Sequence, residues 1–279
     1  MPFCEVTDGL KLYYEDFGDG LPIVFTAAGN LTHKMWEGQV AALAGRYRTI
    51  TYDWRGTGDS DKPRSGYTGE ALAADLSALI GRLDLAPAIL VGHGLGAHVT
   101  ILAATARPEL VRGMVLVSAA PWFSGERDGA VGGVSEDFIR FVAERTGLND
   151  GRGIPYAKAC ADLNEWLFHH AQPPSVQNWI FEQAMTWPQF VLNAYARNMR
   201  ELDHRERLGR IGCPTLIIQG RHDRKQRYEG AAYMASRIKD ARLVTLENSA
   251  HMGEIEELNT FNRALISFVQ EVEALKRVA

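Results

Sequence analysis

The sequence is poor in cysteine and in long apolar runs, and each shortage excludes a class of protein. Its three cysteines, Cys4, Cys160 and Cys213, are too few and too widely spaced for a disulfide framework or a Cys-x-x-Cys metal site, so we expect free thiols. The longest apolar stretches are about half of the ~20 residues that a membrane span needs. The first residues, MPFCEVTDGLK, lack the basic and apolar regions of a signal peptide. We therefore expect a cytoplasmic protein.

The sequence also lacks an excess of charge of either sign. Its 30 Lys and Arg residues against 34 Asp and Glu residues leave a net charge of −4, and the basic residues are scattered. Proteins that bind a phosphate backbone or an anionic membrane concentrate their basic residues, so we expect neither partner. The pair His169-His170 is not at metal-ligand spacing and no His-Glu-x-x-His motif occurs, so we expect no metal and no other cofactor. We therefore expect a small-molecule substrate as the partner, and a chain that is a monomer or forms a homo-oligomer.

What the sequence does contain is a series of short apolar runs separated by helical patterns. Such runs are typical of parallel strands that helices cover on both faces. Near the start, apolar and polar residues alternate from Leu10 to Glu15, which predicts an antiparallel hairpin that turns at Asp8-Gly9. An apolar stripe predicts a helix from Gly69 to Leu83. The fold class is therefore α/β, a mostly parallel, doubly wound sheet with an N-terminal antiparallel hairpin. The predicted parallel strands contain residues 23–25, 49–52, 88–91, 114–117, 216–218 and 243–246.

One long segment, residues 122–207, interrupts this rhythm. It has no strand-like run, and its aromatic residues recur at helical spacings, so we expect a helical cap inserted between core segments 1–121 and 208–279. Its Gly-rich entry, with Gly125, Gly129, Gly132 and Gly133, could act as a hinge. Ligands of open α/β sheets bind at the carboxyl ends of the strands, where this cap would roof a pocket. The aromatic composition of the cap predicts an apolar or aromatic substrate.

The most informative stretch is a strand, a sharp turn and a helix around the run GHGLGA, residues 92–97. Flanking glycines that allow such a turn are typical of the nucleophile elbow Gly-x-Ser-x-Gly, and the nucleophile position here is Gly94. The same glycines match the dinucleotide fingerprint Gly-x-Gly-x-x-Ala. That fingerprint requires an acidic residue at the end of the next strand, which instead reads Val-Ser-Ala-Ala at residues 117–120. Dinucleotide binding is therefore disfavoured.

Further motifs follow in an order that matches the elbow. Asp223 and His251 each come directly after a predicted buried strand, and residues 53–60 read DWRGTGDS. Together these motifs resemble the α/β-hydrolase superfamily, which includes esterases, lactonases and haloperoxidases, over nearly the whole chain. The resemblance implies that His251 is the general base and acid and that Asp223 orients it. It also implies an oxyanion hole made by the N–H of Leu95 and a second N–H.

The second oxyanion donor lies in the loop that reads TAAGN, residues 26–30, where many relatives have His-Gly. This departure leaves the choice between Gly29 and Asn30 open. We also expect three residues to contact substrate: His33 in the same loop, and Trp122 and Phe123 after the strand beside the elbow strand. We interpret His93, His98 and Cys160 as structural residues. Asp53 and Arg55 are interpreted as holding their loop by local hydrogen bonds.

Glycine at the nucleophile position leaves three explanations open. It removes the attacking hydroxyl while relieving strain of about 1–3 kcal/mol. The chain could be a hydrolase of a carboxylic ester, lactone or amide in an inactivated or substrate-trapping form. It could instead be a natural hydrolase without the serine, in which His251 and Asp223 activate water; the runs GHGLGA and YDWRGTG resemble the aminoacrylate/carbamate hydrolase of the Rut pathway. A non-catalytic ligand-binding protein is the third, and the retained Asp223 and His251 count against it.

Overall fold

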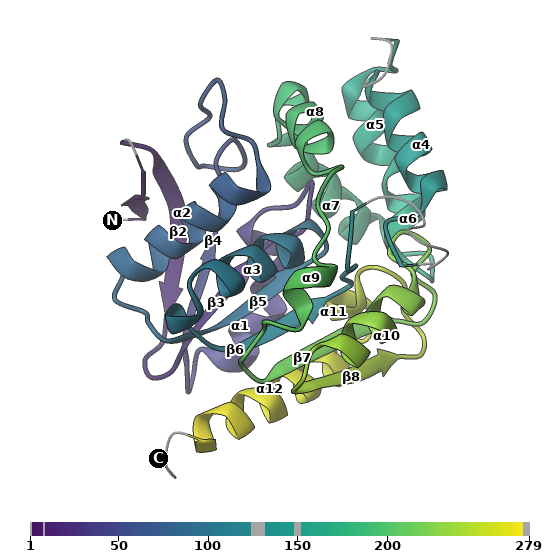
Figure 1. Ribbon diagram of the computed structural model, residues 1–279. Helices are drawn as coiled ribbons and strands as arrows, with labels where there is room; N and C mark the ends of the chain where they lie inside the picture. The colour runs from purple at the N-terminus through teal and green to yellow at the C-terminus, as the bar shows by residue number, and fades with distance from the viewer. Residues whose placement is uncertain (1, 8, 124–131, 148–151, 276–279) are drawn as a thin grey trace.

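The computed structural model describes residues 2–7, 9–123, 132–147 and 152–275, and these form an eight-stranded sheet with helices on both faces (Figure 1). The strand order across the sheet is β1-β2-β4-β3-β5-β6-β7-β8. All six predicted runs lie within strands. The bounds are β1 Phe3–Glu5, β2 Lys11–Phe17, β3 Pro22–Thr26, β4 Arg48–Tyr52, β5 Ala88–His93, β6 Val111–Val117, β7 Thr215–Gly220 and β8 Ala241–Leu246.

The N-terminal strands form the predicted antiparallel hairpin. β1 pairs antiparallel with β2, with Glu5 opposite Lys11, and β2 pairs antiparallel with β4. Gly9 has a φ of +77°, a conformation that glycine adopts readily; Asp8, the other predicted turn residue, lies outside the described residues. Every later pair in the sheet is parallel. The sheet therefore has the predicted doubly wound, mostly parallel arrangement.

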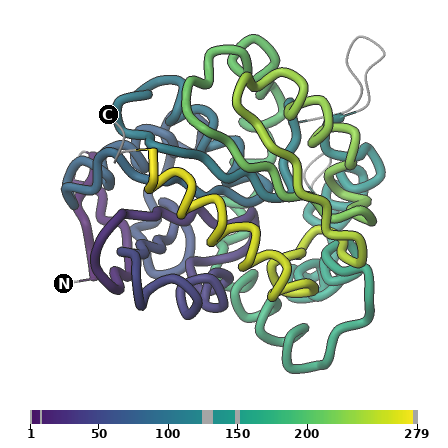
Figure 2. The backbone as a smooth tube through the Cα atoms, turned by 90° about the horizontal axis from the view of Figure 1, so that it is seen from below, coloured from purple at the N-terminus to yellow at the C-terminus, as the bar shows by residue number. Residues whose placement is uncertain are grey.

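Helices cover both faces because successive side chains of a strand point to opposite sides. Along β3, Val24 packs in the cluster that contains α2, α3 and α10, whereas Ile23 and Phe25 pack in the cluster that contains α1 and α12. Figure 2 shows α12 running across one face of the sheet. The bounds are α1 Glu37–Leu43, α2 Gly69–Arg82, α3 Leu95–Ala106, α9 Arg205–Leu208, α10 Tyr228–Arg237, α11 Gly253–Glu256 and α12 Leu258–Leu275, with 3₁₀ turns at His33–Trp36 and Pro108–Leu110.

The segment between β6 and β7 is helical where the structure describes it. Its helices are α4 Glu136–Thr146, α5 Tyr156–Asp162, α6 Asn164–Leu167, α7 Pro174–Met185 and α8 Gln189–Asn198. Two isolated bridges, Trp122 with Asp203 and Val134 with Gln226, connect its ends to each other and to the loop after β7. This arrangement agrees with an inserted cap, although the boundaries at 122 and 207 stay a prediction. Gly125 and Gly129 of the predicted hinge lie outside the described residues.

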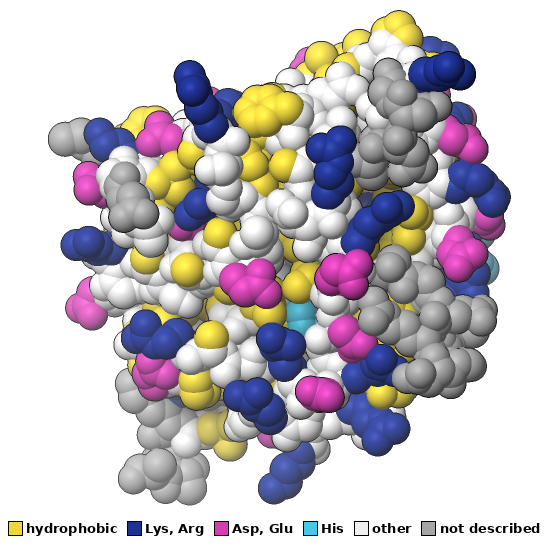
Figure 3. Space-filling view, turned by 45° about the horizontal axis from the view of Figure 1, so that its top comes forward, with side chains coloured by type: hydrophobic (Ala, Val, Ile, Leu, Met, Phe, Trp, Pro, Cys, Tyr) yellow, Lys and Arg dark blue, Asp and Glu magenta, His cyan; other side chains and the backbone are white. Residues whose placement is uncertain are grey.

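No helix in the described part of the chain combines the length and the apolar character needed to cross a bilayer. On the face seen in Figure 3, acidic and basic side chains are interspersed.

Candidate active site

Gly94 is the single residue between β5 and α3. Its φ of +55° and ψ of −116° form a conformation that strains a residue with a Cβ. Its N–H donates a 2.9 Å hydrogen bond to the carbonyl of Val117 in β6. The flanking glycines are sterically required: a Cβ on Gly92 would lie 2.3 Å from Oγ1 of Thr100, and one on Gly96 would lie 2.3 Å from the carbonyl oxygen of Ala27. The elbow geometry is therefore complete although the nucleophile side chain is absent.

The structure brings Asp223 and His251 to this elbow. Asp223 follows β7 and His251 follows β8, and Nδ1 of His251 lies 2.8 Å from Oδ2 of Asp223. On the other side of the ring, Nε2 of His251 lies 3.3 Å from the position that a Cβ on Gly94 would occupy. Among the described residues, Nε2 has no hydrogen-bond partner in the protein. Asp223, His251 and the tip of the elbow are thus arranged as in a catalytic triad, with glycine at the nucleophile position.

Electrostatics favour a neutral imidazole and an ionised carboxylate. Burial, together with the positive charge of Lys225, lowers the pKa of His251 to about 3, although Asp223 opposes the shift. Burial raises the pKa of Asp223, but His251 and the N–H groups of Gln226 and Lys225 outweigh burial, so the pKa is lowered overall. Because an ionised carboxylate only accepts hydrogen bonds, Nδ1 of His251 carries the proton and Nε2 is free to accept one.

The predicted oxyanion donors surround the same point. Leu95 begins α3, so its N–H is among those that lack an intrahelical partner. In the facing loop, the N–H of Ala28 contacts the sulfur of Met35 at 3.1 Å and is therefore occupied. Gly29 and Asn30 follow it, and Asn30 has a φ of +68°. Leu95, Gly29 and Asn30 all line one cavity, and the choice between the last two stays open.

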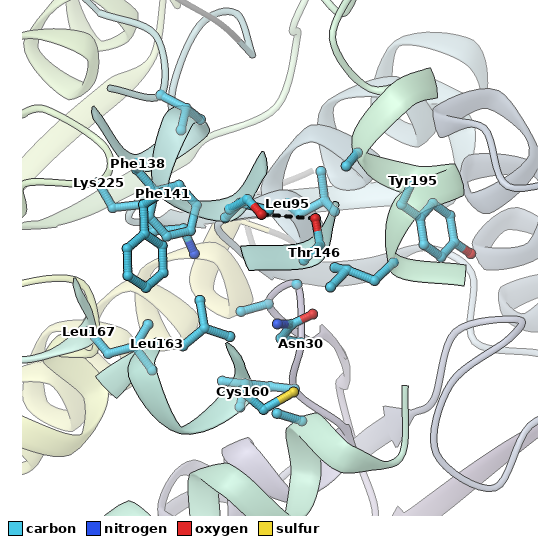
Figure 4. A pocket seen from close by; sticks show the side chains of 18 of the residues that line it. Asn30, Leu95, Phe138, Phe141, Thr146, Cys160, Leu163, Leu167, Tyr195 and Lys225 are labelled. Carbon is cyan, nitrogen blue, oxygen red and sulfur yellow. Dashed lines mark hydrogen bonds between the residues drawn. The ribbon is translucent and has the colours of Figure 1, made fainter. Parts of the chain in front are cut away.

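This cavity lies between the cap and the elbow and is predominantly apolar (Figure 4). Its volume is about 120 Å³, comparable to cavities that hold one small aromatic ring. His251 is on its floor with Leu95. The cap contributes aromatic and aliphatic side chains that include Phe138, Phe141, Leu163, Leu167, Trp187 and Tyr195.

Of the predicted substrate contacts, Phe123 lines the cavity, but His33 and Trp122 do not. A contact of these two residues with substrate stays a prediction. His33 is buried at the start of a 3₁₀ turn, where Nδ1 lies 2.8 Å from Oδ1 of Asp53 and holds the ring away from the cavity. The ring of Trp122 is fully buried and packs edge-on against Tyr233, under the entry to the cap.

Three further histidines, His93, His98 and His204, are buried in contacts with the protein. His93, under the elbow, has Nε2 2.9 Å from the carbonyl oxygen of His251 and 3.4 Å from Glu254. His98 shares a 2.9 Å hydrogen bond with His204. Among the described residues, no group of three or more His, Cys, Asp or Glu side chains is arranged to hold a metal ion.

The other singled-out residues fall into two groups. The cysteines are free, as predicted, and Cys160 contributes to the cavity wall with a pKa that burial raises. Asp53 accepts a hydrogen bond from the N–H of Asp59 within its own loop, whereas Arg55 pairs with Asp75 of helix α2 at 2.5 Å, which is not a local contact.

Sequence reasoning missed several cavity residues, of which Lys225 is the one nearest in the chain to Asp223. Lys225 lines the cavity two residues after Asp223. The signal that could have found it is its place in the loop after a predicted catalytic strand, because side chains there converge on the same edge of the sheet.

Comparison with known proteins places the site in a family context. A family model described as alpha/beta hydrolase fold matches residues 22–258. "AB hydrolase superfamily protein YisY" of Bacillus subtilis is 31% identical, over 95% of this chain and 98% of that protein. "Putative carbamate hydrolase RutD" of Azorhizobium caulinodans is 29% identical, over 98% of this chain and 100% of that protein. Among solved structures, an esterase from Exiguobacterium antarcticum superposes with a TM-score of 0.88 at 29% identity, covering 96% of this chain and 98% of that one.

Proposed function

We propose, from the premise that this chain belongs to the alpha/beta hydrolase fold family, that it is a hydrolase of a carboxylic ester, lactone or amide bond in a small, predominantly apolar or aromatic substrate. The observation that carries the proposal is the position of His251. Its Nε2 lies 3.3 Å from the place of a side chain on Gly94, while Nδ1 is held by Asp223. A base so placed can take a proton from a group at the elbow tip.

The residues have distinct roles in this proposal. With a serine at the tip, Oγ would attack the carbonyl carbon while Nε2 of His251 takes its proton. The negative charge on the carbonyl oxygen would be bound by the N–H of Leu95 and by that of Gly29 or Asn30. Collapse of the tetrahedral intermediate breaks the bond to the leaving group, which takes the proton from His251. Water then repeats the sequence on the acyl group.

Glycine at the tip removes the covalent route, so we propose that the chain is impaired in it. A second candidate is direct hydrolysis, in which His251 takes a proton from water as the water oxygen attacks the carbonyl carbon. Two observations favour this candidate: Nε2 has no protein partner, and one relative along the whole chain carries the name of a carbamate hydrolase. Collapse of the resulting tetrahedral intermediate breaks the bond to the leaving group, which takes the proton from His251, and no acyl intermediate forms.

The test is a comparison of the unmodified chain with Gly94→Ser and Gly94→Ala, assayed on 4-nitrophenyl butyrate. The alanine variant is the matched control, because it introduces the same Cβ without a hydroxyl. A gain of about 10³-fold or more with serine alone supports an elbow built for a serine nucleophile. Equal turnover by all three proteins, lost in His251→Ala, supports the water route. If no variant hydrolyses any ester, lactone or amide yet ligands still bind, both hydrolytic proposals are overturned in favour of a ligand-binding protein.

A further inference from the structure

The charges around the cavity have one sign. The described residues that line it include Arg145, Arg200 and Lys225, but no Asp or Glu. Arg145 already pairs with Asp162 at 3.0 Å, its guanidinium lies 3.9 Å from the centre of the Phe141 ring, and Arg200 also has a partner. The cation that remains available to a ligand is Lys225.

Lys225 is held in place at its backbone and unpaired at its end. Its N–H donates a 2.9 Å hydrogen bond to Oδ1 of Asp223, which ties the residue to the carboxylate that orients His251. Its Nζ lies 4.7 Å from the centre of the Phe138 ring. Within the described part of the chain, Nζ has no hydrogen bond or ion pair to any other group. Figure 4 shows the side chain beside Phe138 and Phe141 on the cavity wall.

An ammonium group in such apolar surroundings is destabilised until an anion pairs with it. Burial lowers the pKa of Lys225 to about 8, while Asp223 acts in the opposite direction. The carboxylate of Asp223 does not serve as its partner, because that group is bound to His251 and to two backbone N–H groups. A ligand carboxylate would relieve the destabilisation and gain a charge-assisted hydrogen bond.

We propose that Lys225 is the recognition site for a carboxylate of the substrate, so that the substrate joins an apolar body and a free carboxylate to the bond that is cleaved. This inference rests on the proposed function and narrows its substrate class. The carboxylate would lie beside Phe138 while the cleaved carbonyl lies between Gly94 and Leu95. The substrate carbons between them would pack on the apolar cap.

The test must separate recognition of a carboxylate by Lys225 from the effect of Lys225 on the pKa of His251. Its positive charge also lowers the pKa of His251, so any substitution of Lys225 alters the base as well. A ratio between two substrates measured on the same protein cancels that effect, because both substrates use the same base.

The first experiment uses the Gly94→Ser variant and two nearly isosteric esters. These are 4-nitrophenyl pentanoate and the mono-4-nitrophenyl ester of glutarate, which carries a carboxylate where the first has a methyl group. We expect Lys225→Met to lower the glutarate-to-pentanoate ratio of kcat/KM by about tenfold or more, and Lys225→Arg to keep it within about threefold. A ratio that Lys225→Met leaves unchanged within about twofold overturns the assignment.

A pH series on the same pair identifies the titrating group. The other titratable residues lining the cavity keep their charge between pH 7 and 9: burial raises the pKa of Tyr156, Cys160 and Tyr195 and lowers that of His251. We therefore expect the ratio to fall as pH rises through about 8, where Lys225 loses its proton. A ratio that is constant over this range contradicts the proposal.

A binding experiment on the unmodified chain distinguishes failure of this inference from failure of the proposed function. Pentanoate and its neutral isostere pentanamide are titrated and followed by ligand-observed NMR. Tighter binding of pentanoate that Lys225→Met abolishes supports the carboxylate site even if no variant has esterase activity. Equal binding of both ligands, or a preference that survives Lys225→Met, overturns the site even if Gly94→Ser is an active esterase.

Discussion

At the scale of single residues, Gly94 has the backbone conformation of a nucleophile elbow although it carries no nucleophile side chain. With a φ of +55° and a ψ of −116°, the tip keeps the strained geometry that places a side chain against His251. The strain is imposed by the junction of β5 and α3 and by the hydrogen bond to Val117, and glycine tolerates it. The elbow is thus a property of the surrounding packing, independent of the residue at its tip.

The first prediction follows from this strain. Gly94→Ser and Gly94→Ala should each lower the free energy of unfolding by about 1–3 kcal/mol, because any Cβ there is strained and must also fit 3.3 Å from Nε2 of His251. Urea denaturation followed by tryptophan fluorescence measures it. Similar losses in both variants assign the effect to the backbone; a stability equal to that of the unmodified chain contradicts it.

The second prediction concerns the bond between Asp223 and His251. In the Gly94→Ser variant, Asp223→Asn should lower kcat by about 10⁴-fold, because an amide can donate to Nδ1 and hold the imidazole in the wrong tautomer. Asp59→Asn, an exposed residue, is the matched control and should leave kcat unchanged. A loss smaller than about tenfold would mean that Asp223 does not set the tautomer.

At the scale of elements, helix α7 of the cap is hydrogen-bonded to the loop that follows β3. Oε1 of Gln183 accepts hydrogen bonds from the N–H and the hydroxyl of Thr32, at 3.2 and 3.1 Å, and all of these groups are buried. The indole N–H of Trp187, just beyond α7, donates to the carbonyl of Leu31 at 3.0 Å. The cap is therefore bonded to the loop in which we propose the second oxyanion donor, and it also roofs the cavity.

The third prediction tests this connection. Gln183→Met should lower the free energy of unfolding by about 1–3 kcal/mol, because the buried N–H of Thr32 loses its acceptor. In the Gly94→Ser background it should also lower kcat, since the loop with Gly29 and Asn30 loses an anchor. Gln177→Met changes an exposed residue of the same helix and serves as the control. Unaltered stability and kcat in Gln183→Met would show that the cap does not position the loop.

At the scale of the whole molecule, the core holds histidines in the neutral form. Burial lowers the pKa of His98 to about 4 and that of His251 to about 3, and it lowers the pKa of His204 well below its usual value. These groups bind protons in the unfolded chain, near pH 6.5, before they do so in the folded one. His33 shifts the opposite way: burial lowers its pKa, but Asp53 outweighs burial and raises it. The stabilisation from His33 is therefore fully present below pH 6.5 and is lost as pH rises through its raised pKa.

The fourth prediction is loss of stability in mild acid. The three lowered groups stabilise the fold above pH 6.5, and this stabilisation is lost as pH falls toward their folded values, with a slope approaching about 4 kcal/mol per pH unit. Urea denaturation at pH 7, 6 and 5 measures it. His204→Gln should reduce the slope by about 1.4 kcal/mol per pH unit. Stability that is flat from pH 7 to 5 would contradict the prediction.

The local sequence was sufficient to predict the sheet and to place Gly94, Asp223 and His251 at its carboxyl edge. Strands covered on both faces are continuous apolar runs. At the elbow, Gly92 is required by its close contact with Thr100 a few residues along the chain, whereas Gly96 is required by Ala27 in the distant loop after β3. Asp223 and His251 could be placed because each follows such a run, and parallel strands end at one edge. The proposed roles of Asp223 and His251 depend on this convergence at one edge of the sheet.

By itself, then, the sequence determined the order of the elements and which residues reach the carboxyl edge of the sheet, because these depend on periodicity and on steric limits between neighbours. Only the tertiary structure decided where the side chains in the loops point. His33 turns to Asp53, Trp122 turns under the cap entry, and Lys225 enters the cavity. The physical reason is that each direction is selected by partners from distant segments, which local spacing does not encode.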